Sequence, residues 1–549
     1  MDRRFALALV LSFCVLLVFQ IWIAPKSKRG IPPRTADSTL STSPRPGLDT
    51  TQIVGTAPGG TDSAVSLPFL SDSLLAAAAG LPEEILPIHT KSVDASFTNR
   101  GGRLASWVLK DYKTYQGTPV GMLQDEGELG LVLETEKGIL DLREVPFRHR
   151  LEWGAKGEQM VVFETATTSG LRVTKRYTVP PEGYLVGLEV EITGDETVTE
   201  YRLAWDRALP RVEHDPRQER MASGTIVLMG NNLNTLRPAS FRKVSEKEVA
   251  GNVRWAGVRN KYFVAAMVPP AETSSRVVAT GSAATQETGA QVVMPLLRGE
   301  GRHAFQIYLG PLDYSHLKSL GLGLDHAVNL GYKFVRPLSQ LLLVSMEWLF
   351  RFIPNFGVVI IIISVLTKLI FYPLTRSSVR SMKALQVLQP EISALRDKFK
   401  GDPQRLQRET MNLYKQNKVN PMGGCIPMLV QMPVFIALYA VLANCIELRQ
   451  APFMLWMHDL STPDVLFTAG SFPIHVLPVV MFATTLLQQK LTPVSDPKQK
   501  LMGYMMPVMM LFIFYSFPAG LNLYWTVNNV LTVAQQWHIH REVAHEAKA

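Results

Sequence analysis

The chain has 549 residues, of which 47% are hydrophobic and only 19% are charged, and its formal net charge is +9. The hydrophobic residues are concentrated near the amino terminus and in the last third of the chain, with a long polar segment between them. This distribution excludes a single compact water-soluble domain and predicts a membrane protein with one large water-facing domain. The polar segment contains no cysteine, so no disulfide framework supports it.

The amino-terminal region predicts an anchor followed by a tether. Residues 1–24 contain an apolar run that is too long for a cleaved signal peptide and lacks a clear small-residue cleavage site. We therefore expect an uncleaved signal-anchor span. Residues 25–85 are rich in Pro, Ser, Thr and Gly and have little to bury, which predicts a disordered tether.

Residues 86–320 have the alternating pattern of β-strands. The segments LRVTKRYTV (171–179) and LEVEIT (188–193) alternate apolar and polar residues around a Pro-Pro-Glu-Gly turn, which predicts an antiparallel hairpin. No helical stretch is expected before about residue 315, and the best prediction is an exported β-sandwich. The sequence shows no catalytic or metal-binding constellation in this domain, so a binding or spacing module is expected.

From residue 321 the pattern becomes helical. Residues 321–355 carry an apolar stripe, but Lys333, Arg336, Glu347 and Arg351 make the segment too charged for a span. An amphipathic helix lying in the outer membrane interface is expected.

Residues 356–540 form a predicted core of five spans, because a bilayer core needs about 20 apolar helical residues. With the signal anchor, this core gives six spans. A short tail at 541–549 follows. The loop 373–424 carries ten Lys and Arg residues against four Asp and Glu, a net +6, so it is expected in the cytoplasm together with both termini, and the polar domain outside. The five predicted spans are 356–372, 425–446, 472–489, 501–517 and 519–537.

The cytoplasmic loop predicts a hairpin of two amphipathic helices over 376–418. One apolar face runs from Met382 to Phe399, Gly401 ends that helix, and Asp402 can cap the next. The basic surface could attract anionic lipid, ribosomal RNA or a nascent chain, and ordinary positive-inside charge explains it equally well. The basic residues chosen as candidates are Arg380, Lys383, Arg396, Lys398, Arg405 and Arg408.

One charged residue lies inside a predicted span. Lys368 interrupts the run IIIISVLTKLIFYPLTR (360–376), where a charge costs roughly 2.5–3.5 kcal/mol on insertion scales. Ser364 and Tyr372 are expected one turn away on the same face, with Thr367 adjacent. A lysine that snorkels to the headgroups is the structural alternative. No acidic residue lies well inside a late span, and amides such as Gln431 and Asn528 occur in the others, so we expect a water-containing cavity around the cation.

Several segments of the last third resemble one family. YKQNKVNPMGGCIPMLVQMPVFIALY (414–439), FYPLT (371–375), LQPEI (388–392), ELRQAPFMLWMHDLS (447–461) and FPAGLNLYW (517–525) resemble the signature of the YidC/Oxa/Alb membrane protein insertases. The GPLDY segment (310–314) is similar to the Gram-negative form, whose periplasmic domain is a β-supersandwich.

This resemblance implies an inner-membrane insertase and chaperone rather than an enzyme, with no cofactor. Five core spans would enclose a hydrophilic groove that is open to the cytoplasm and to lipid but closed outside. Lys368 matches the positive residue that receives the nascent segment, where many relatives carry arginine. Ser364 and Trp525, with Tyr524 adjacent, match positions that contact substrate, although relatives often have threonine and tyrosine there.

The partners implied are nascent membrane proteins, the Sec translocon, membrane lipids and the ribosome through the cytoplasmic loops, but not DNA. The short tail contains two basic and two acidic residues, which gives little support to a ribosome-binding role for it.

Other functions remain open from the residues alone. A solute transporter or channel should show paired acidic and basic residues or an internal repeat. A membrane hydrolase needs a nucleophile with a base, or a metal motif, within the spans. A non-insertase assembly scaffold is harder to distinguish, because the exported domain and the cytoplasmic hairpin could both be docking sites.

Overall fold

The structure is a computed structural model that describes residues 82–123, 127–167, 170–242, 245–271, 276–419, 426–470, 472–491 and 497–546. The predicted first span and the tether up to residue 81 lie outside the described residues, as do residues 547–549. The chain forms two compact units, one over Pro44–Val328 and the other containing Asn329–Ala549. Each unit is considered by itself.

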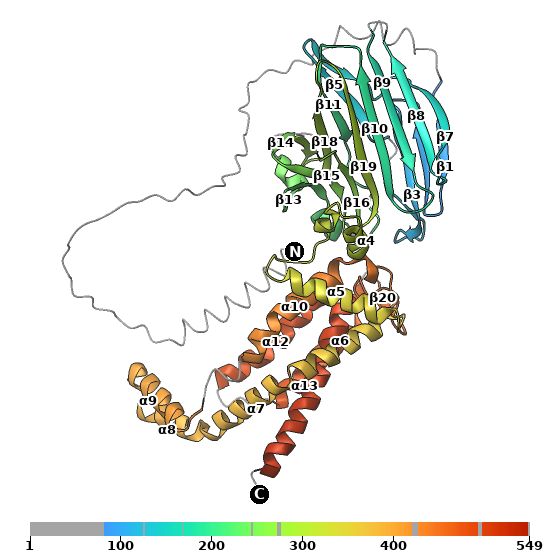
Figure 1. Cartoon of the computed structure of the whole chain (residues 1–549). Helices are drawn as coiled ribbons and strands as arrows, with labels where there is room; N and C mark the ends of the chain where they lie inside the picture. Colours follow the sequence, from blue (N-terminus) through green and yellow to red (C-terminus); the bar gives the residue numbers. More distant parts are fainter. Residues whose placement is uncertain are drawn as a thin grey trace, which may run out of the picture. The chain divides into compact units, whose positions relative to one another are not determined.

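The first unit is built from three antiparallel sheets of four, nine and six strands (Figure 1). Their orders are β1-β2-β3-β4, β13-β12-β15-β16-β19-β10-β9-β8-β7 and β14-β17-β18-β11-β5-β6. The strands are β1 Ile85–His89, β2 Val93–Thr98, β3 Arg103–Lys113, β4 Pro119–Gly121, β5 Gly130–Thr135, β6 Gly138–Asp141, β7 Arg148–Trp153, β8 Gln159–Ala166, β9 Arg172–Val179, β10 Leu185–Thr193, β11 Val198–Trp205, β12 Gly224–Met229, β13 Asn232–Leu236, β14 Glu246–Ala250, β15 Val253–Arg259, β16 Phe263–Val268, β17 Arg276–Ser282, β18 Glu287–Pro295 and β19 Gly301–Pro311.

Both smaller sheets pack against the nine-stranded sheet. Trp107 of β3 donates through Nε1 to the carbonyl of Leu309 on β19 at 2.9 Å. The hydroxyl of Tyr201 on β11 lies 3.0 Å from Nδ1 of His303, which also belongs to β19. Large aromatic side chains fill the core between the layers. The predicted β-sandwich is confirmed.

The β9–β10 hairpin follows directly from its alternating sequence. Leu188 pairs with Tyr177 and Ile192 with Val173, and buried residues alternate along both strands. Gly183 in the connecting turn has a φ of 97°, a left-handed conformation that favours glycine.

The expectation of no helix before about residue 315 is wrong. Helix α3 covers Pro216–Ala222, and the Asp215 side chain accepts hydrogen bonds from the backbone N–H groups of Arg217 and Gln218. A capping aspartate followed by proline is a helix-start signal that the alternation of the neighbouring strands obscures. After β19, helix α4 (Tyr314–Ser319) and the 3-10 turn η2 (Leu324–Ala327) complete the unit.

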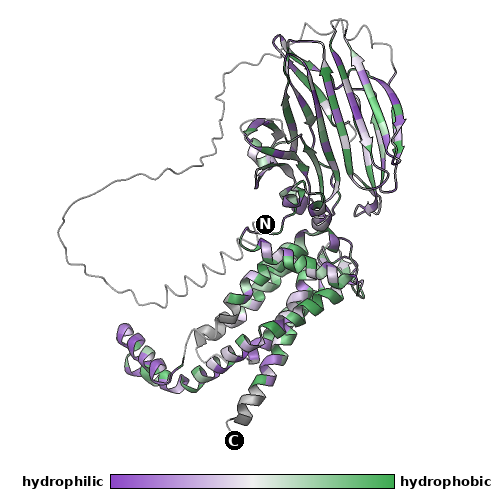
Figure 2. Cartoon of the chain, viewed as in Figure 1, coloured by the Kyte–Doolittle hydropathy of each residue, from purple (hydrophilic) through white to green (hydrophobic). Residues whose placement is uncertain are grey.

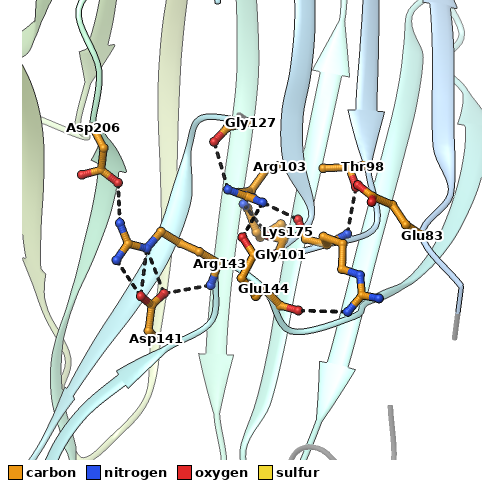
Figure 3. A network of polar contacts seen from close by, with 11 residues as sticks. Glu83, Thr98, Gly101, Arg103, Gly127, Asp141, Arg143, Glu144, Lys175 and Asp206 are labelled. Atoms are coloured by element: carbon orange, nitrogen blue, oxygen red, sulfur yellow. Dashed lines mark hydrogen bonds and ion pairs between the residues drawn. The ribbon is translucent and has the colours of Figure 1, made fainter. Parts of the chain in front are cut away.

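A polar network in the β unit extends from exposed residues to the buried Lys175 (Figure 3). The Arg143 guanidinium contacts Asp141 at 2.6 Å and Asp206 at 2.7 Å. Nearby, the ammonium of Lys175 is fully buried and donates to backbone carbonyls of Gly101 and Leu129. Strong charges in this domain are therefore satisfied within the fold.

The second unit is a helical bundle with a small hairpin. Helix α13 packs against α6, α10 and α11, while α5 packs against α10 and α6. Hydrophobic residues dominate α6 and α10, whereas α8 and α9 are largely hydrophilic (Figure 2). The elements are α5 Arg336–Phe350, α6 Phe356–Ile370, α7 Tyr372–Val387, α8 Gln389–Lys398, α9 Pro403–Gln416, α10 Ile426–Asn444, η3 Ile446–Leu448, β20 Phe467–Ala469, β21 Phe472–Ile474, α11 Val476–Leu491, α12 Pro497–Phe514 and α13 Ala519–Glu546.

Several helix boundaries differ from the predicted spans. The span predicted to end at 372 stops at Ile370, and the chain bends by 60° into α7. Residues 472–474 belong to strand β21, so the next helix starts at Val476. The continuous apolar run across this junction concealed the change of structure. Helix α13 continues beyond 537 to Glu546.

The first helix predicted for the cytoplasmic hairpin is divided in two. Helix α7 ends at Val387 and α8 begins at Gln389, with Pro390 in its first turn. Proline is tolerated in a first turn but interrupts a continuing helix, and this explains the break.

By length and mean hydropathy, the bent pair α6–α7 meets the requirements of a membrane span, whereas no single helix among the described residues does so. The number of spans remains a prediction.

Candidate functional site

Lys368 lies near the end of α6, two residues before the helix ends at Ile370. Asn355 begins this helix, because its side-chain oxygen accepts a hydrogen bond from the backbone N–H of Val358 at 3.2 Å. Ten of the fifteen residues between these ends are aliphatic, so an otherwise apolar helix carries the lysine.

The ammonium of Lys368 connects α6 to α13. Its Nζ donates to the hydroxyl of Thr532 at 2.7 Å, and that hydroxyl donates in turn to the carbonyl of Asn528 at 2.7 Å. Gln535 approaches from the same helix and donates through Nε2 to the Lys368 carbonyl at 3.5 Å. The cation is half-buried, and its side-chain partner is a neutral hydroxyl.

Across the described residues, no ion pair joins Lys368 to a carboxylate. An ion pair of the helical unit joins Lys400 to Asp397 at 2.9 Å, in the hairpin predicted over 376–418. A charge in this environment is costly unless donors, acceptors or water solvate it.

The hydroxyl groups beside Lys368 bond to their own helix. Ser364 donates to the carbonyl of Ile360 at 2.7 Å, and Thr367 donates to that of Ile363 at 2.6 Å. Ser364 is buried, whereas Thr367 is half-buried. Ser364 and Lys368 lie in α6 with the expected i, i+4 spacing, but Tyr372 begins α7 beyond the bend, so its expected place on the same straight helix is wrong.

The remaining groove candidates gather around α10 and α13. Tyr524 of α13 is buried, and Gln431 of α10 is half-buried. The Trp525 ring lies 4.9 Å from that of Phe435 and 5.1 Å from that of Phe514. These contacts form an aromatic cluster, while Asn528 belongs to the Lys368 site through its backbone carbonyl.

Sequence reasoning missed Thr532, the direct partner of Lys368. Thr532 follows Asn528 by four residues and precedes Gln535 by three, so all three lie on one face of α13. Searching for that helical spacing around the amides would have identified the threonine.

The basic candidates of the hairpin predicted over 376–418 come from three helices. Arg380 and Lys383 belong to α7, Arg396 and Lys398 to α8, and Arg405 and Arg408 to α9. Lys383 is half-buried, and the other five are exposed. The Arg405 guanidinium lies 5.2 Å from the centre of the Phe399 ring, and this contact joins α9 to the end of α8.

In the described ranges, no group of three or more His, Cys, Asp or Glu residues is arranged to hold a metal ion. The polar chemistry of the site is therefore that of amides, hydroxyls and one ammonium group.

An antiparallel β-sandwich followed by a bundle of apolar helices that carries a half-buried cation is the arrangement of a membrane protein with one large water-facing domain. The family model described as YidC periplasmic domain matches residues 85–344, and the model described as 60Kd inner membrane protein matches residues 348–546. The membrane protein insertase YidC of Syntrophus aciditrophicus is 33% identical, with 99% of this chain and 100% of the relative covered. That of Geobacter metallireducens is 31% identical, with 99% of each covered. The chain belongs to the YidC family of membrane protein insertases.

A crystal structure of an active YidC insertase is 18% identical, covers 84% of this chain and 96% of its own, and superposes with a TM-score of 0.36. The family assignment rests on the sequence matches. The resemblance and the insertase function expected from the motifs are confirmed, and the family is one of insertases rather than enzymes. This assignment replaces the transporter and hydrolase alternatives.

Proposed function

We propose that the helical unit receives a nascent membrane segment in a hydrophilic groove at Lys368 and releases it sideways into lipid. The groove would be bounded by Ser364, Thr367 and Tyr372 on one side. Gln431, Tyr524, Trp525 and Asn528 would contribute from α10 and α13. Such a groove lowers the barrier for polar loops because it supplies water and hydrogen-bond donors inside the bilayer.

The observation that carries this proposal is the bonding of Lys368. An ammonium group has three donors, and the hydrogen bond to Thr532 uses one of them. A hydroxyl is a neutral, rotatable partner, so an incoming carboxylate or carbonyl can replace it without breaking an ion pair. Burial of the apolar part of the segment, at about 25 cal/mol per Å², then drives its release into lipid.

The proposed topology has six spans, with both termini in the cytoplasm. Helix α5 would lie in the outer interface, supported by the exposure of Leu341, Trp348 and Phe352 along one side of the segment. The basic hairpin of α7, α8 and α9 would meet anionic lipid headgroups or a ribosome. The Sec translocon is the expected partner for larger substrates, and no role with DNA is proposed.

The test replaces Lys368 and measures insertion of a small single-span substrate in cells depleted of the native protein. Lys368→Glu should abolish insertion, because it repels acidic substrate segments. Lys368→Arg should retain it, and the effect of Lys368→Ala should depend on the charge of the substrate. Equal accumulation of the variants provides the control. Normal insertion by Lys368→Glu would contradict the proposal.

A further inference from the structure

The segment 449–464, here called the outer loop, follows η3 and precedes strand β20. Its own hydrogen bonds give it a fixed shape. The Asp459 side chain accepts from the backbone N–H groups of Gln450 at 3.1 Å and Ser461 at 2.8 Å. Gln450 and Leu455 both have left-handed backbones, with φ of 56° and 54°. A loop that holds such conformations is strongly determined by its contacts.

The outer loop contacts the beginning of α6. Asn355, the residue that caps this helix, donates through Nδ2 to the carbonyl of Phe453 at 3.1 Å. The Phe453 ring occupies the position that a Cβ atom on Gly357 would need. Glycine at 357 therefore permits the loop to lie directly on the first turn of α6.

The same loop supplies acceptors to the beginning of α13. The carbonyl of Thr462 accepts from the N–H of Ala519 at 2.7 Å, and that of Leu460 accepts from the N–H of Gly520 at 2.9 Å. The first N–H groups of a helix have no partner within the helix, so these bonds satisfy two of them.

The third connection is made by Asp464 at the beginning of α11. This side chain is 3% exposed, and its Oδ2 accepts from the backbone N–H groups of Val476 at 2.9 Å and Leu477 at 2.8 Å. The same oxygen accepts from Trp456 Nε1 at 3.3 Å, within the outer loop. One carboxylate therefore ties the loop to α11, at a helix end that favours negative charge.

The three helices joined by the outer loop are also connected to one another farther along, at the Lys368 site and beside it. Lys368 of α6 bonds to Thr532 of α13, and Asn529 of α13 donates to Thr485 of α11 at 2.8 Å. Both contacts lie on the parts of these helices that are remote from the outer loop. The loop thus sets the separation of the helices whose side chains form the site.

We infer that Asp464 is a positioning residue that keeps the outer loop seated on α6, α11 and α13 and so closes the groove toward the periplasm. This inference rests on the proposed function, because it assigns one end of the proposed groove. A bundle that is tied at this end can admit polypeptide from the cytoplasm and from lipid without opening a continuous path across the membrane.

The experiment measures access to the groove from outside in intact cells. The full chain is prepared with Cys14, Cys425 and Cys445 replaced by serine and with Ser364→Cys as the probe. A membrane-impermeant maleimide is then added to the periplasmic side. Labelling should be slow with Asp464 and about 2- to 30-fold faster with Asp464→Ala, the range that corresponds to loss of one helix cap. Asp464→Asn, which keeps an oxygen acceptor, should be intermediate.

Two controls make the result specific. Asp215→Ala removes a comparable helix cap from α3 in the other unit and should leave the labelling rate unchanged. Labelling from the cytoplasmic side, in inverted vesicles, should not change with Asp464→Ala. Equal external labelling of Asp464→Ala and its parent, or faster labelling from both sides, would overturn the inference.

If Asp464→Ala fails to accumulate, the labelling rates of the milder Asp464→Asn variant test the inference by the same criteria. Labelling does not depend on insertion activity, so normal insertion by Lys368→Glu would contradict the proposed groove chemistry and leave the closure result readable. Conversely, an unchanged labelling rate removes the role of Asp464 without affecting the Lys368 test.

Discussion

The two units of the chain each hold a lysine away from bulk water, and they treat it differently. Lys175 of β9 is fully buried, donates to the carbonyls of Gly101 at 3.1 Å and Leu129 at 2.7 Å, and lies 5.4 Å from the centre of the Tyr177 ring. Burial holds the pKa of Lys175 well below its ordinary value. Lys368 is only half-buried, and it donates to a hydroxyl.

The difference lies in what each partner can do. The carbonyls that accept from Lys175 are fixed in the backbone of the β unit, so exchanging them would disturb the fold. Thr532 can rotate, and its hydroxyl already has a second acceptor in the Asn528 carbonyl. A lysine bonded to two backbone carbonyls is part of the structure, whereas one held by a rotatable side chain is available to a substrate.

The largest effect on stability is expected at Lys175. Lys175→Ala leaves two buried carbonyls without a donor and opens a cavity, so we expect the β unit to lose about 2–5 kcal/mol of stability. Lys368→Ala should cost the helical unit less than about 1 kcal/mol, because a half-buried side chain with one neutral hydrogen bond contributes little. Hydrogen exchange of peptides from β9 and α6 in the full chain measures both changes. Equal losses of stability in the two units would contradict the proposed difference between a structural lysine and an exchangeable one.

The β unit also differs by holding carboxyl groups whose pKa is raised by burial. Burial raises the pKa of Glu128 to about 8, and its Oε2 accepts from the N–H of Asp206 at 2.7 Å. The unfolded value is 4.5, so the folded state binds the proton more tightly, and its stability falls as the pH rises from about 5 to 8, at about 1.4 kcal/mol per pH unit. Glu128→Gln should remove this contribution, measured by urea unfolding of the full chain at several pH values.

Glu219 provides a matched comparison. Burial raises its pKa to about 7, and it accepts from the backbone N–H of Val212 at 2.9 Å. Glu219→Gln should reduce the fall of stability with rising pH only up to about pH 7. Glu128→Gln should reduce the same fall up to about pH 8. An unchanged slope in Glu128→Gln would show that this carboxyl is ionised in the folded domain.

The smallest effect on insertion is expected at the direct partner of Lys368. Thr532→Val keeps the side-chain shape but removes the hydroxyl, so the ammonium loses one hydrogen bond worth about 0.5–1.5 kcal/mol. We expect insertion of a small single-span substrate to change by about 2- to 13-fold, the same free energy written as a ratio. Thr532→Ser retains the hydroxyl and should behave as the parent does. Identical activity of the valine and serine variants would mean that this bond has no role in insertion.

The β-sandwich and the insertase family could be predicted from sequence because both depend on local patterns. Alternation marks strands such as β9 and β10, and the motif around 414–439 identifies the family. Helix boundaries were harder to predict, because the sequence stays apolar through the bend at Phe371 and through strand β21. The Lys368–Thr532 bond joins residues 164 positions apart, and such a pairing depends on how α6 packs against α13.

Helix α13 runs without interruption from Ala519 to Glu546, a length of about 42 Å at 1.5 Å per residue. That exceeds the roughly 30 Å of a hydrocarbon core, so a helix of this length placed across a membrane would extend into the aqueous phase. Its first turn is fastened to the outer loop, and Thr532 lies about 20 Å farther along the axis. Because the first turn of this straight helix is fixed, any tilt of α13 about that turn would change the separation of Thr532 and Lys368.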